Sequence, residues 1–243
     1  MKEREKKVID AQAFYSNRML EIDYKHAEFV YRSIKPFFRG ERALELGPAS
    51  GYMTKRLVSD FKSLQLIEAS AELASQVPAY PNVIVHHSMF ENFKSSEQFD
   101  TIIMSHVLEH VEQPVELLIK VKGWLAPAGA VIVVVPNAKS IHRIVAAKMG
   151  ILETIYALNE RDIALGHYRV YDTASIGKDM MAAGLKITNS GGSFLKPLSN
   201  AQMEEHWTEE MIEGFYEAGK EFPDNCAEIF MIAHNSINTK FAP

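Results

Sequence analysis

The chain has 243 residues, of which 47% are hydrophobic. This length suits one α/β domain with a substantial core, so any separate second domain would be small. The net charge of −5 comes from 26 basic and 31 acidic residues, which are dispersed along the chain. Because no sustained basic stretch is present, we expect no nucleic-acid partner.

Cys226 is the only cysteine, which excludes an intramolecular disulfide and a zinc site built from four cysteines. This cysteine content fits a reducing cytoplasm. Residues 1–12 are too charged for the apolar region of a signal peptide, and the longest apolar run, residues 130–136, is far shorter than a membrane span. We therefore expect a cytoplasmic protein with no membrane partner, and the sequence leaves its oligomeric state open.

Residues 1–40 predict an N-terminal helical arm, followed by one larger domain over residues 41–243. Within the arm, segment 24–38 places Val30 and Ile34 on one helical stripe, and Pro36 helps to end it. We expect this helix to lie against an edge of the sheet.

Strands and helical patterns then alternate, with strands predicted at residues 43–46, 64–67, 83–85, 101–104 and 130–135. This alternation predicts βαβ units and a parallel sheet. Residues 140–166 form a largely helical, apolar insertion, which we interpret as a lid over a substrate site. A helix follows at 172–183, with Asp172 as its N-cap and Gly184 as its stop, and then a strand at 185–190.

A second insertion, which we also interpret as a lid, covers residues 197–224 and precedes a final strand at 227–233. It carries an apolar residue at every fourth position, a spacing that predicts one amphipathic helix with a packed stripe: Met203, Trp207, Met211 and Phe215. Acidic residues surround this stripe, and we interpret them as a solvated surface.

The most informative stretch is RALELGPASG at residues 42–51, where an apolar strand runs into a tight turn. Gly47 and Gly51 let the backbone turn sharply into the next helix, close to a ligand. Glu45 suits a cationic or hydroxyl-rich ligand better than a pyrophosphate. Glu68 ends the second strand, where folds of this kind place a carboxylate on ribose hydroxyls. The expected ligand is a nucleoside without a phosphate chain.

Together, the ExGxxxG pattern from Glu45 to Gly51, Glu68, and FDTIIMSHVLEH at residues 99–110 resemble class I S-adenosylmethionine-dependent methyltransferases. The resemblance covers residues 24–192 and is strongest over 42–137. It implies S-adenosylmethionine as the cofactor and a doubly wound, Rossmann-like α/β fold. In that fold, a seven-stranded, mostly parallel sheet ends with a C-terminal antiparallel strand beside strand five.

The resemblance also assigns the cofactor-binding positions. Glu45, Gly47 and Gly51 would contact the methionine part of the cofactor, and Glu68 and Ala69 the ribose. Ser88 and Met89 would contact the adenine. Ser105 would lie beneath the sulfonium, and Tyr15 of the arm would close over the cofactor. This chain departs from the family at Ala49, where many members carry glycine. Pro48 also removes one N–H from the turn.

His106, Glu109 and His110 match HxxEH, an inverted zinc-protease signature. That signature requires a helix through both histidines, whereas this segment directly follows a strand. We therefore expect no metal. His106 lies at the carboxyl end of the fourth strand, where ligands of open α/β sheets bind, so we expect it to contact cofactor or substrate.

The segment GHYRVYD at residues 166–172 resembles a stretch that many relatives carry between lid and helix. His167 has the chemistry to accept a proton from a hydroxyl or ammonium, and its alternative role is structural, at the hinge of the lid. His167 and His106 are the expected catalytic residues. Tyr168 and Arg169 are the expected substrate-binding residues, with a structural tie as the alternative for Arg169.

These features predict a methyltransferase that acts on an oxygen, either hydroxyl or carboxylate, of a small molecule or peptide. A carboxylate is already ionised, whereas a hydroxyl would benefit from a histidine base. Two alternatives stay open. A nicotinamide-dependent oxidoreductase shares the strand–turn–helix unit but would require the missing GxGxxG fingerprint. The other is a non-catalytic S-adenosylmethionine-binding protein.

Overall fold

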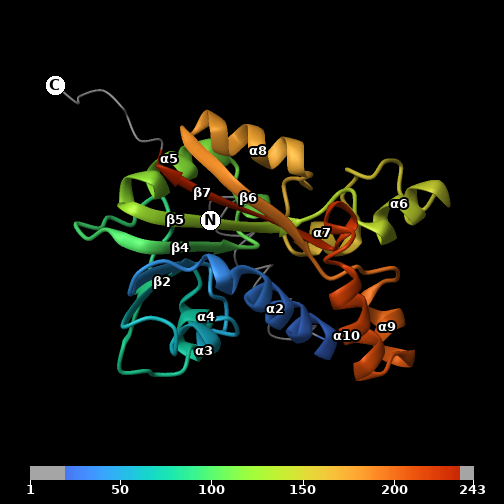
Figure 1. Cartoon of the computed structure of the whole chain (residues 1–243), viewed down its shortest axis with the longest axis horizontal. Coiled ribbons are helices and arrows are strands. Elements are labelled where there is room, and N and C mark those ends of the chain that lie inside the picture. Colours follow the sequence, from blue (N-terminus) through green and yellow to red (C-terminus); the bar gives the residue numbers. More distant parts are fainter. Residues whose placement is uncertain (1–19, 236–243) are drawn as a thin grey trace.

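The computed structural model describes residues 20–235, which form a seven-stranded sheet with helices on both faces (Figure 1). The strand order is β3-β2-β1-β4-β5-β7-β6. The strands are β1 Arg42–Leu46, β2 Ser63–Glu68, β3 Val83–His87, β4 Phe99–Ser105, β5 Leu125–Pro136, β6 Leu185–Ser193 and β7 Glu228–Asn235.

Strands β1 to β5 pair in parallel, whereas β7 runs antiparallel to both β5 and β6. The doubly wound sheet with its C-terminal antiparallel strand is therefore confirmed. The sequence of β5 is a continuous apolar run, and the packing of its two faces explains why. Val131 and Val133 pack in the cluster on one face, and Ile132 and Val134 pack in the cluster on the other. A strand that is buried on both faces has no polar alternation.

Helices α5 (Pro114–Trp124) and α8 (Thr173–Ala182) contribute to the first of these clusters, whereas α2 (Glu21–Ile34) and α3 (Thr54–Leu57) contribute to the second. The short helix α4 (Ala71–Gln76) follows β2. Asp172 caps α8 as predicted, because its carboxylate accepts the N–H of Ser175 at 2.8 Å. The predicted helix at 24–38 is α2 followed by the short 3-10 helix η1 (Lys35–Phe37). Whether residues 1–40 form a separate arm stays a prediction.

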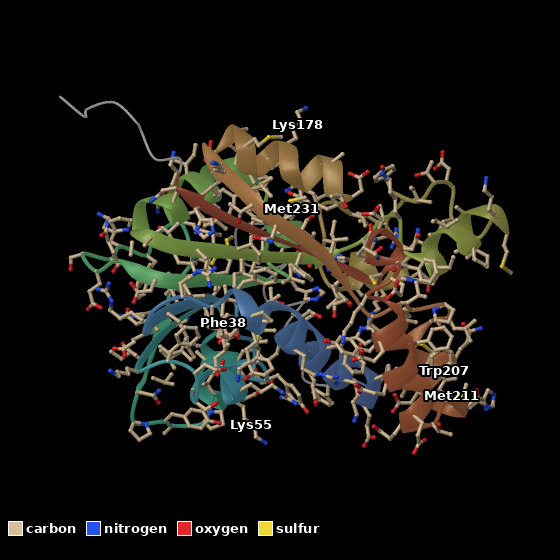
Figure 2. All side chains as sticks on the ribbon, in the orientation of Figure 1. Phe38, Lys55, Lys178, Trp207, Met211 and Met231 are labelled. Atoms are coloured by element: carbon tan, nitrogen blue, oxygen red, sulfur yellow. The ribbon has the colours of Figure 1, made fainter. Side chains whose placement is uncertain are left out.

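The second insertion forms two helices, α9 (Asn200–His206) and α10 (Glu209–Ala218), so the prediction of one continuous striped helix is wrong. Thr208 interrupts it, because its side chain caps α10 by accepting the N–H of Met211 at 3.3 Å. Trp207 and Met211 lie toward the outer end of this pair (Figure 2). Met203 of the predicted stripe is buried against α2 together with Ile212 and Tyr216, and Trp207 and Phe215 are partly buried against the same cluster.

The acidic residues of this insertion also pair with α2. Glu213 takes a bidentate ion pair from Arg32, at 2.5 and 2.9 Å, and Lys25 pairs with Glu209 at 2.5 Å. The first insertion is less helical than predicted. It contains α6 (Ile141–Lys148) and α7 (Glu160–Ala164), with an irregular segment between them. A 3-10 turn, η3 (Pro223–Asn225), leads into β7.

The strand order places a crevice between β1 and β4. From β1 the chain proceeds to β2 and β3 on one side, and it then returns to β4 on the other. The connections that leave the carboxyl ends of β1 and β4 therefore diverge, and open α/β sheets bind ligands at such a point. Among residues 20–235, no helix is both long and apolar enough to cross a membrane.

Candidate functional site

A cavity of about 270 Å³ lies at the carboxyl ends of β1 and β4. Glu45 and Gly47 line it from the end of β1, and Ser105 and His106 line it from the end of β4. Its other walls come from α2, the first insertion, the segment before α9, and β7. Sheet topology thus brings four predicted site residues to one cavity.

The turn after β1 uses three left-handed residues, Gly47, Ala49 and Gly51. Gly47 has φ 66°, and its N–H donates to the carbonyl of Ile67 at 2.9 Å. Ala49 has φ 49°, a conformation that costs a residue with a side chain about 1–2 kcal/mol. Glu68 stabilises this conformation, because its Oε2 accepts the N–H of Ala49 at 3.1 Å. The family's preference for glycine at this position therefore has a conformational reason.

Two buried carboxylates flank the turn. Glu45 is 3% exposed and accepts a hydrogen bond from Thr54 at 2.6 Å, and burial raises its pKa to about 7. Burial likewise raises the pKa of Glu68, whose Oε1 accepts the N–H of Ser70 at 2.8 Å. These carboxylates would repel a pyrophosphate, whereas the ammonium and ribose hydroxyls of S-adenosylmethionine suit them.

Among the described residues, the remaining predicted cofactor positions do not line this cavity. Ser88 follows β3, where its N–H donates to the carbonyl of Glu68 at 2.9 Å and its hydroxyl donates to the carbonyl of Met89 at 2.9 Å. The backbone of Gly51 lies close to Val77. Gly51, Glu68, Ala69, Ser88 and Met89 lie at or beyond the carboxyl ends of β1, β2 and β3. Their contacts with the cofactor stay predictions. Tyr15 lies outside the described residues.

His106 and Glu109 form a pair at the end of β4. His106 has φ 54°, and its Nδ1 lies 3.2 Å from Oε1 of Glu109. Glu109 is fully buried, and neither of its carboxylate oxygens accepts a hydrogen bond of standard geometry from a described residue. Burial acts to lower the pKa of His106, but its close ion pair with the carboxylate of Glu109 outweighs burial and raises it.

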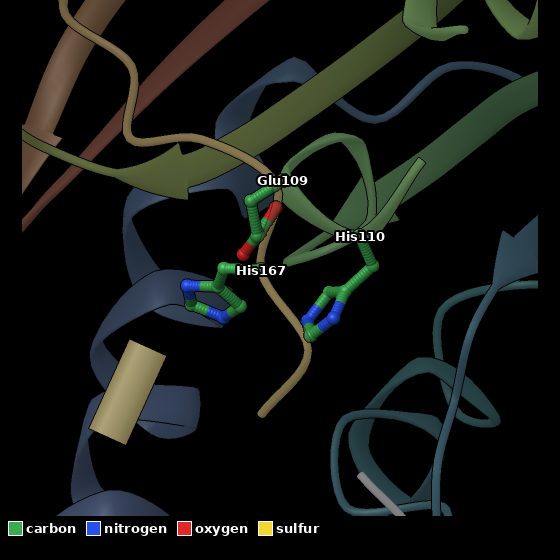
Figure 3. Close-up of side chains that lie close together, drawn as sticks. All are labelled: Glu109, His110 and His167. Atoms are coloured by element: carbon green, nitrogen blue, oxygen red, sulfur yellow. The ribbon is translucent and has the colours of Figure 1, made fainter. Parts of the chain in front are cut away.

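A loop after α7 brings His167 to the same place. The N–H of Tyr168 donates to the carbonyl of Glu109 at 2.8 Å, and Arg169 donates to the carbonyl of Val111 at 2.5 Å. The imidazole of His167 then packs edge-on against that of His110, with ring centroids 4.6 Å apart. Figure 3 shows Glu109 and His110 from the 3-10 helix η2 (Leu108–His110) converging with His167.

His167 lines the cavity, whereas Tyr168 and Arg169 do not. The guanidinium of Arg169 also donates to the carbonyls of Leu108 and Glu112, at 3.3 and 3.0 Å. These bonds occupy Arg169 in holding the loop against η2. The geometry therefore favours the structural tie over substrate binding for this residue.

Charged residues that the sequence did not reveal line the end of the cavity away from the turn. They form ion pairs between distant segments: His26 with Glu228 at 3.1 Å, Arg161 with Asp23 at 2.8 Å, and Arg143 with Asp162 at 3.0 Å. Local patterns carry no signal for such pairs, since His26 and Glu228 are 202 positions apart.

Lys196 lines the same end and makes no ion pair within the described residues; its Nζ donates to Oδ1 of Asn200 at 2.8 Å. Burial lowers the pKa of Lys196 to about 8. This lysine is therefore a half-buried donor that lines the cavity and makes no ion pair with a described carboxylate.

Comparison with known proteins identifies the family. A model of the methyltransferase domain matches residues 18–190, well over half of the chain. The chain belongs to this methyltransferase family. S-adenosylmethionine is the cofactor of this class I enzyme. No curated protein matches the sequence.

Solved methyltransferases share the fold at low sequence identity. An S-adenosylmethionine-dependent methyltransferase of Thermotoga maritima is 16% identical, with a TM-score of 0.66 over 95% of this chain and 100% of its own. The N-methyltransferase NodS of Bradyrhizobium japonicum, in complex with S-adenosylhomocysteine, is 13% identical, with a TM-score of 0.56 over 96% of both chains. The plantazolicin methyltransferase BpumL is 17% identical, with a TM-score of 0.59 over 96% of this chain and 98% of its own.

These findings decide between the alternatives that the sequence left open. Because the chain belongs to a methyltransferase family, we reject two hypotheses: a nicotinamide-dependent oxidoreductase and a non-catalytic binding protein. The zinc-protease interpretation of HxxEH also lacks its helix, because His110 ends a three-residue 3-10 turn and His106 precedes it.

Proposed function

We propose that this methyltransferase transfers its methyl group to an oxygen, of either a hydroxyl or a carboxylate, in a small molecule or short peptide. The observation that carries the proposal is the His106–Glu109 pair at the cavity. Because Nδ1 of His106 faces Glu109 at 3.2 Å, its Nε2 is left to accept a proton from an acceptor hydroxyl.

When bound, S-adenosylmethionine supplies an electrophilic methyl group on a sulfonium. In our proposal Glu45 takes the ammonium of the cofactor, and Glu68 takes the ribose hydroxyls. Ser105 and His106 then border the acceptor from the end of β4. Alignment and exclusion of water account for much of the rate in such a displacement, and a base typically adds about 10²–10⁴-fold for a hydroxyl.

The charges at the far end of the cavity support an oxygen acceptor over a cationic amine. Asp23, Asp162 and Glu228 already pair with Arg161, Arg143 and His26 respectively. Lys196 is the cation that remains without a carboxylate partner in the described part of the cavity wall. An acceptor with a carboxylate or another anionic group would complete an ion pair with Lys196, whereas an ammonium would be repelled.

The first insertion supports the idea of a lid. Arg143, Arg161, Asp162 and Leu165 all come from residues 140–166 and line the cavity. The ion pair of Arg161 with Asp23 links this insertion to α2, and the pair of Arg143 with Asp162 braces it internally. A cover held in this way would exclude water from the transfer.

The test is a transfer assay with labelled S-adenosylmethionine and acceptor pairs that differ only in a hydroxyl or an amine on the same carbon scaffold. The proposal predicts that label enters hydroxyl or carboxylate members at least about tenfold faster than their amine partners. Consistent preference for the amine members would contradict it. Mass spectrometry of the products locates the methyl group.

A further inference from the structure

Glu109 carries an electrostatic problem that the fold does not solve with hydrogen bonds. Its carboxylate is fully buried; Nδ1 of His106 lies 3.2 Å from Oε1, and neither oxygen accepts a hydrogen bond of standard geometry from a described residue. A buried carboxylate without donors is costly unless a positive charge compensates it. The groups around it are imidazoles, which compensate the charge either by binding protons or by sharing a metal ion.

The imidazoles of His110 and His167 are arranged so that they could share a metal ion with Glu109. One ligand atom from each of Glu109, His110 and His167 lies within 4.8 Å of the other two (Figure 3). Ligand atoms around a tetrahedral Zn²⁺ lie about 3.4 Å apart, and trans ligands of an octahedral ion lie about 4.2 Å apart. Small side-chain rotations therefore suffice to bring the three atoms to bonding distance.

An outer contact holds the ring of His167 in an orientation suited to a ligand. Nδ1 of His167 lies 3.3 Å from a carboxylate oxygen of Asp162, which leaves Nε2 toward the cluster. A histidine that binds a metal typically gives its other ring nitrogen to a carboxylate or carbonyl in this way. The pair Asp162–Arg143, at 3.0 Å, in turn fixes Asp162.

We propose that Glu109, His110 and His167 bind one divalent transition-metal ion, and that its free coordination positions receive the acceptor hydroxyl. The second part of this proposal rests on the proposed oxygen methylation. Two imidazoles and one carboxylate favour Zn²⁺, Mn²⁺, Fe²⁺ or Co²⁺ over Mg²⁺ and Ca²⁺, which prefer all-oxygen sites. The proposal replaces the sequence-based expectation that the chain holds no metal.

His110 and His167 both line the cavity, so an ion bound by them would be accessible to an acceptor there. A bound cation of this kind lowers the pKa of the hydroxyl that it contacts. In the transfer, the hydroxyl loses its proton to His106 or to water, and a lone pair of its oxygen forms a bond to the methyl carbon. The carbon–sulfur bond breaks at the same time, and its electron pair stays on sulfur.

The experiment is a Co²⁺ titration of the full-length chain, purified without a polyhistidine tag and freed of metal by chelation. We expect one Co²⁺ per chain with a visible d–d absorption band, which Zn²⁺ displaces and Mg²⁺ does not. Glu109→Gln and His167→Gln should each weaken Co²⁺ binding at least about 100-fold. His206→Gln, on the exposed surface of α9, is the matched control and should bind Co²⁺ like the wild type.

Calorimetric titration with S-adenosylhomocysteine runs in parallel, so that the two proposals fail separately. If the wild type binds S-adenosylhomocysteine but neither Co²⁺ nor Zn²⁺ below about 100 µM, the metal proposal is overturned and the methyltransferase site stands. Equal Co²⁺ affinity in the wild type and the Glu109→Gln variant would also overturn it. Should either variant fail to fold, Asp162→Asn, a change to the outer contact, is expected to weaken Co²⁺ binding about 10–100-fold.

Metal dependence of turnover completes the test. Once hydroxyl acceptors are identified, EDTA should abolish their methylation, and Zn²⁺ or Co²⁺ should restore it. Full turnover in the chelated enzyme would overturn the catalytic part of the proposal, even where the ion binds.

Discussion

Replacement of Glu45 by glutamine should remove a pH dependence of cofactor binding that the wild type shows near neutrality. Glu45 is buried beside the turn, and burial raises its pKa to about 7. If the ammonium of the cofactor binds only the ionised carboxylate, affinity follows the ionised fraction of Glu45. That fraction is about 9% at pH 6.0 and about 76% at pH 7.5, so affinity should rise about eightfold.

The same pKa predicts the opposite trend for stability without cofactor. A carboxyl group whose pKa is higher in the folded state stabilises the fold fully below its unfolded value, near 4.5, and this contribution is lost as pH rises through about 7. A shift of this size corresponds to about 3 kcal/mol of unfolding free energy. The free wild type should therefore lose stability between pH 5 and 8 relative to Glu45→Gln.

Calorimetric titration with S-adenosylhomocysteine at pH 6.0 and 7.5, with thermal unfolding at each pH, measures both effects. Glu116→Gln, on the exposed surface of α5, is the matched control and should keep the wild-type profile. Glu45→Gln should bind more weakly at pH 7.5, with little change between the two pH values. An eightfold rise that persists in Glu45→Gln, or a flat wild-type profile, would refute the reasoning.

Three further substitutions test other parts of the site. Glu68→Ala leaves the N–H groups of Ala49 and Ser70 without their acceptor and should weaken binding of S-adenosylhomocysteine about 10–100-fold; unchanged affinity in calorimetry would contradict this. His106→Asn keeps a residue that tolerates positive φ, and turnover should fall about 10²–10⁴-fold with cofactor affinity unchanged, whereas undiminished turnover would remove His106 from the mechanism. Lys196→Met should raise KM for anionic acceptors about tenfold or more without lowering Tm, and an unchanged KM would rule out Lys196 as an acceptor contact.

The sequence predicted the fold because the signals were local. The apolar run of β5 is long enough to mark a strand buried on both faces, and the Asp172 cap fixes the start of α8. The end of β1 at Glu45 and Gly47 is a local pattern as well. Once strand order is known, these ends of parallel strands must meet at one edge of the sheet.

Features that depend on contacts between distant segments were beyond such reasoning. No local pattern links His26 to Glu228, or places a loop carrying His167 against Glu109. The break between α9 and α10 is different, because Thr208 followed by two glutamates is a recognisable helix start. The apolar residue at every fourth position was a stronger pattern than this helix start, and it suggested one continuous helix.

The central claim is that the cavity between β1 and β4 binds S-adenosylmethionine. Its most direct test is calorimetric titration of the wild-type protein with S-adenosylhomocysteine, in parallel with NADH. We predict saturable binding of one S-adenosylhomocysteine per chain and no binding of NADH. A folded protein that binds NADH, or that leaves S-adenosylhomocysteine unbound at millimolar concentration, would contradict the account.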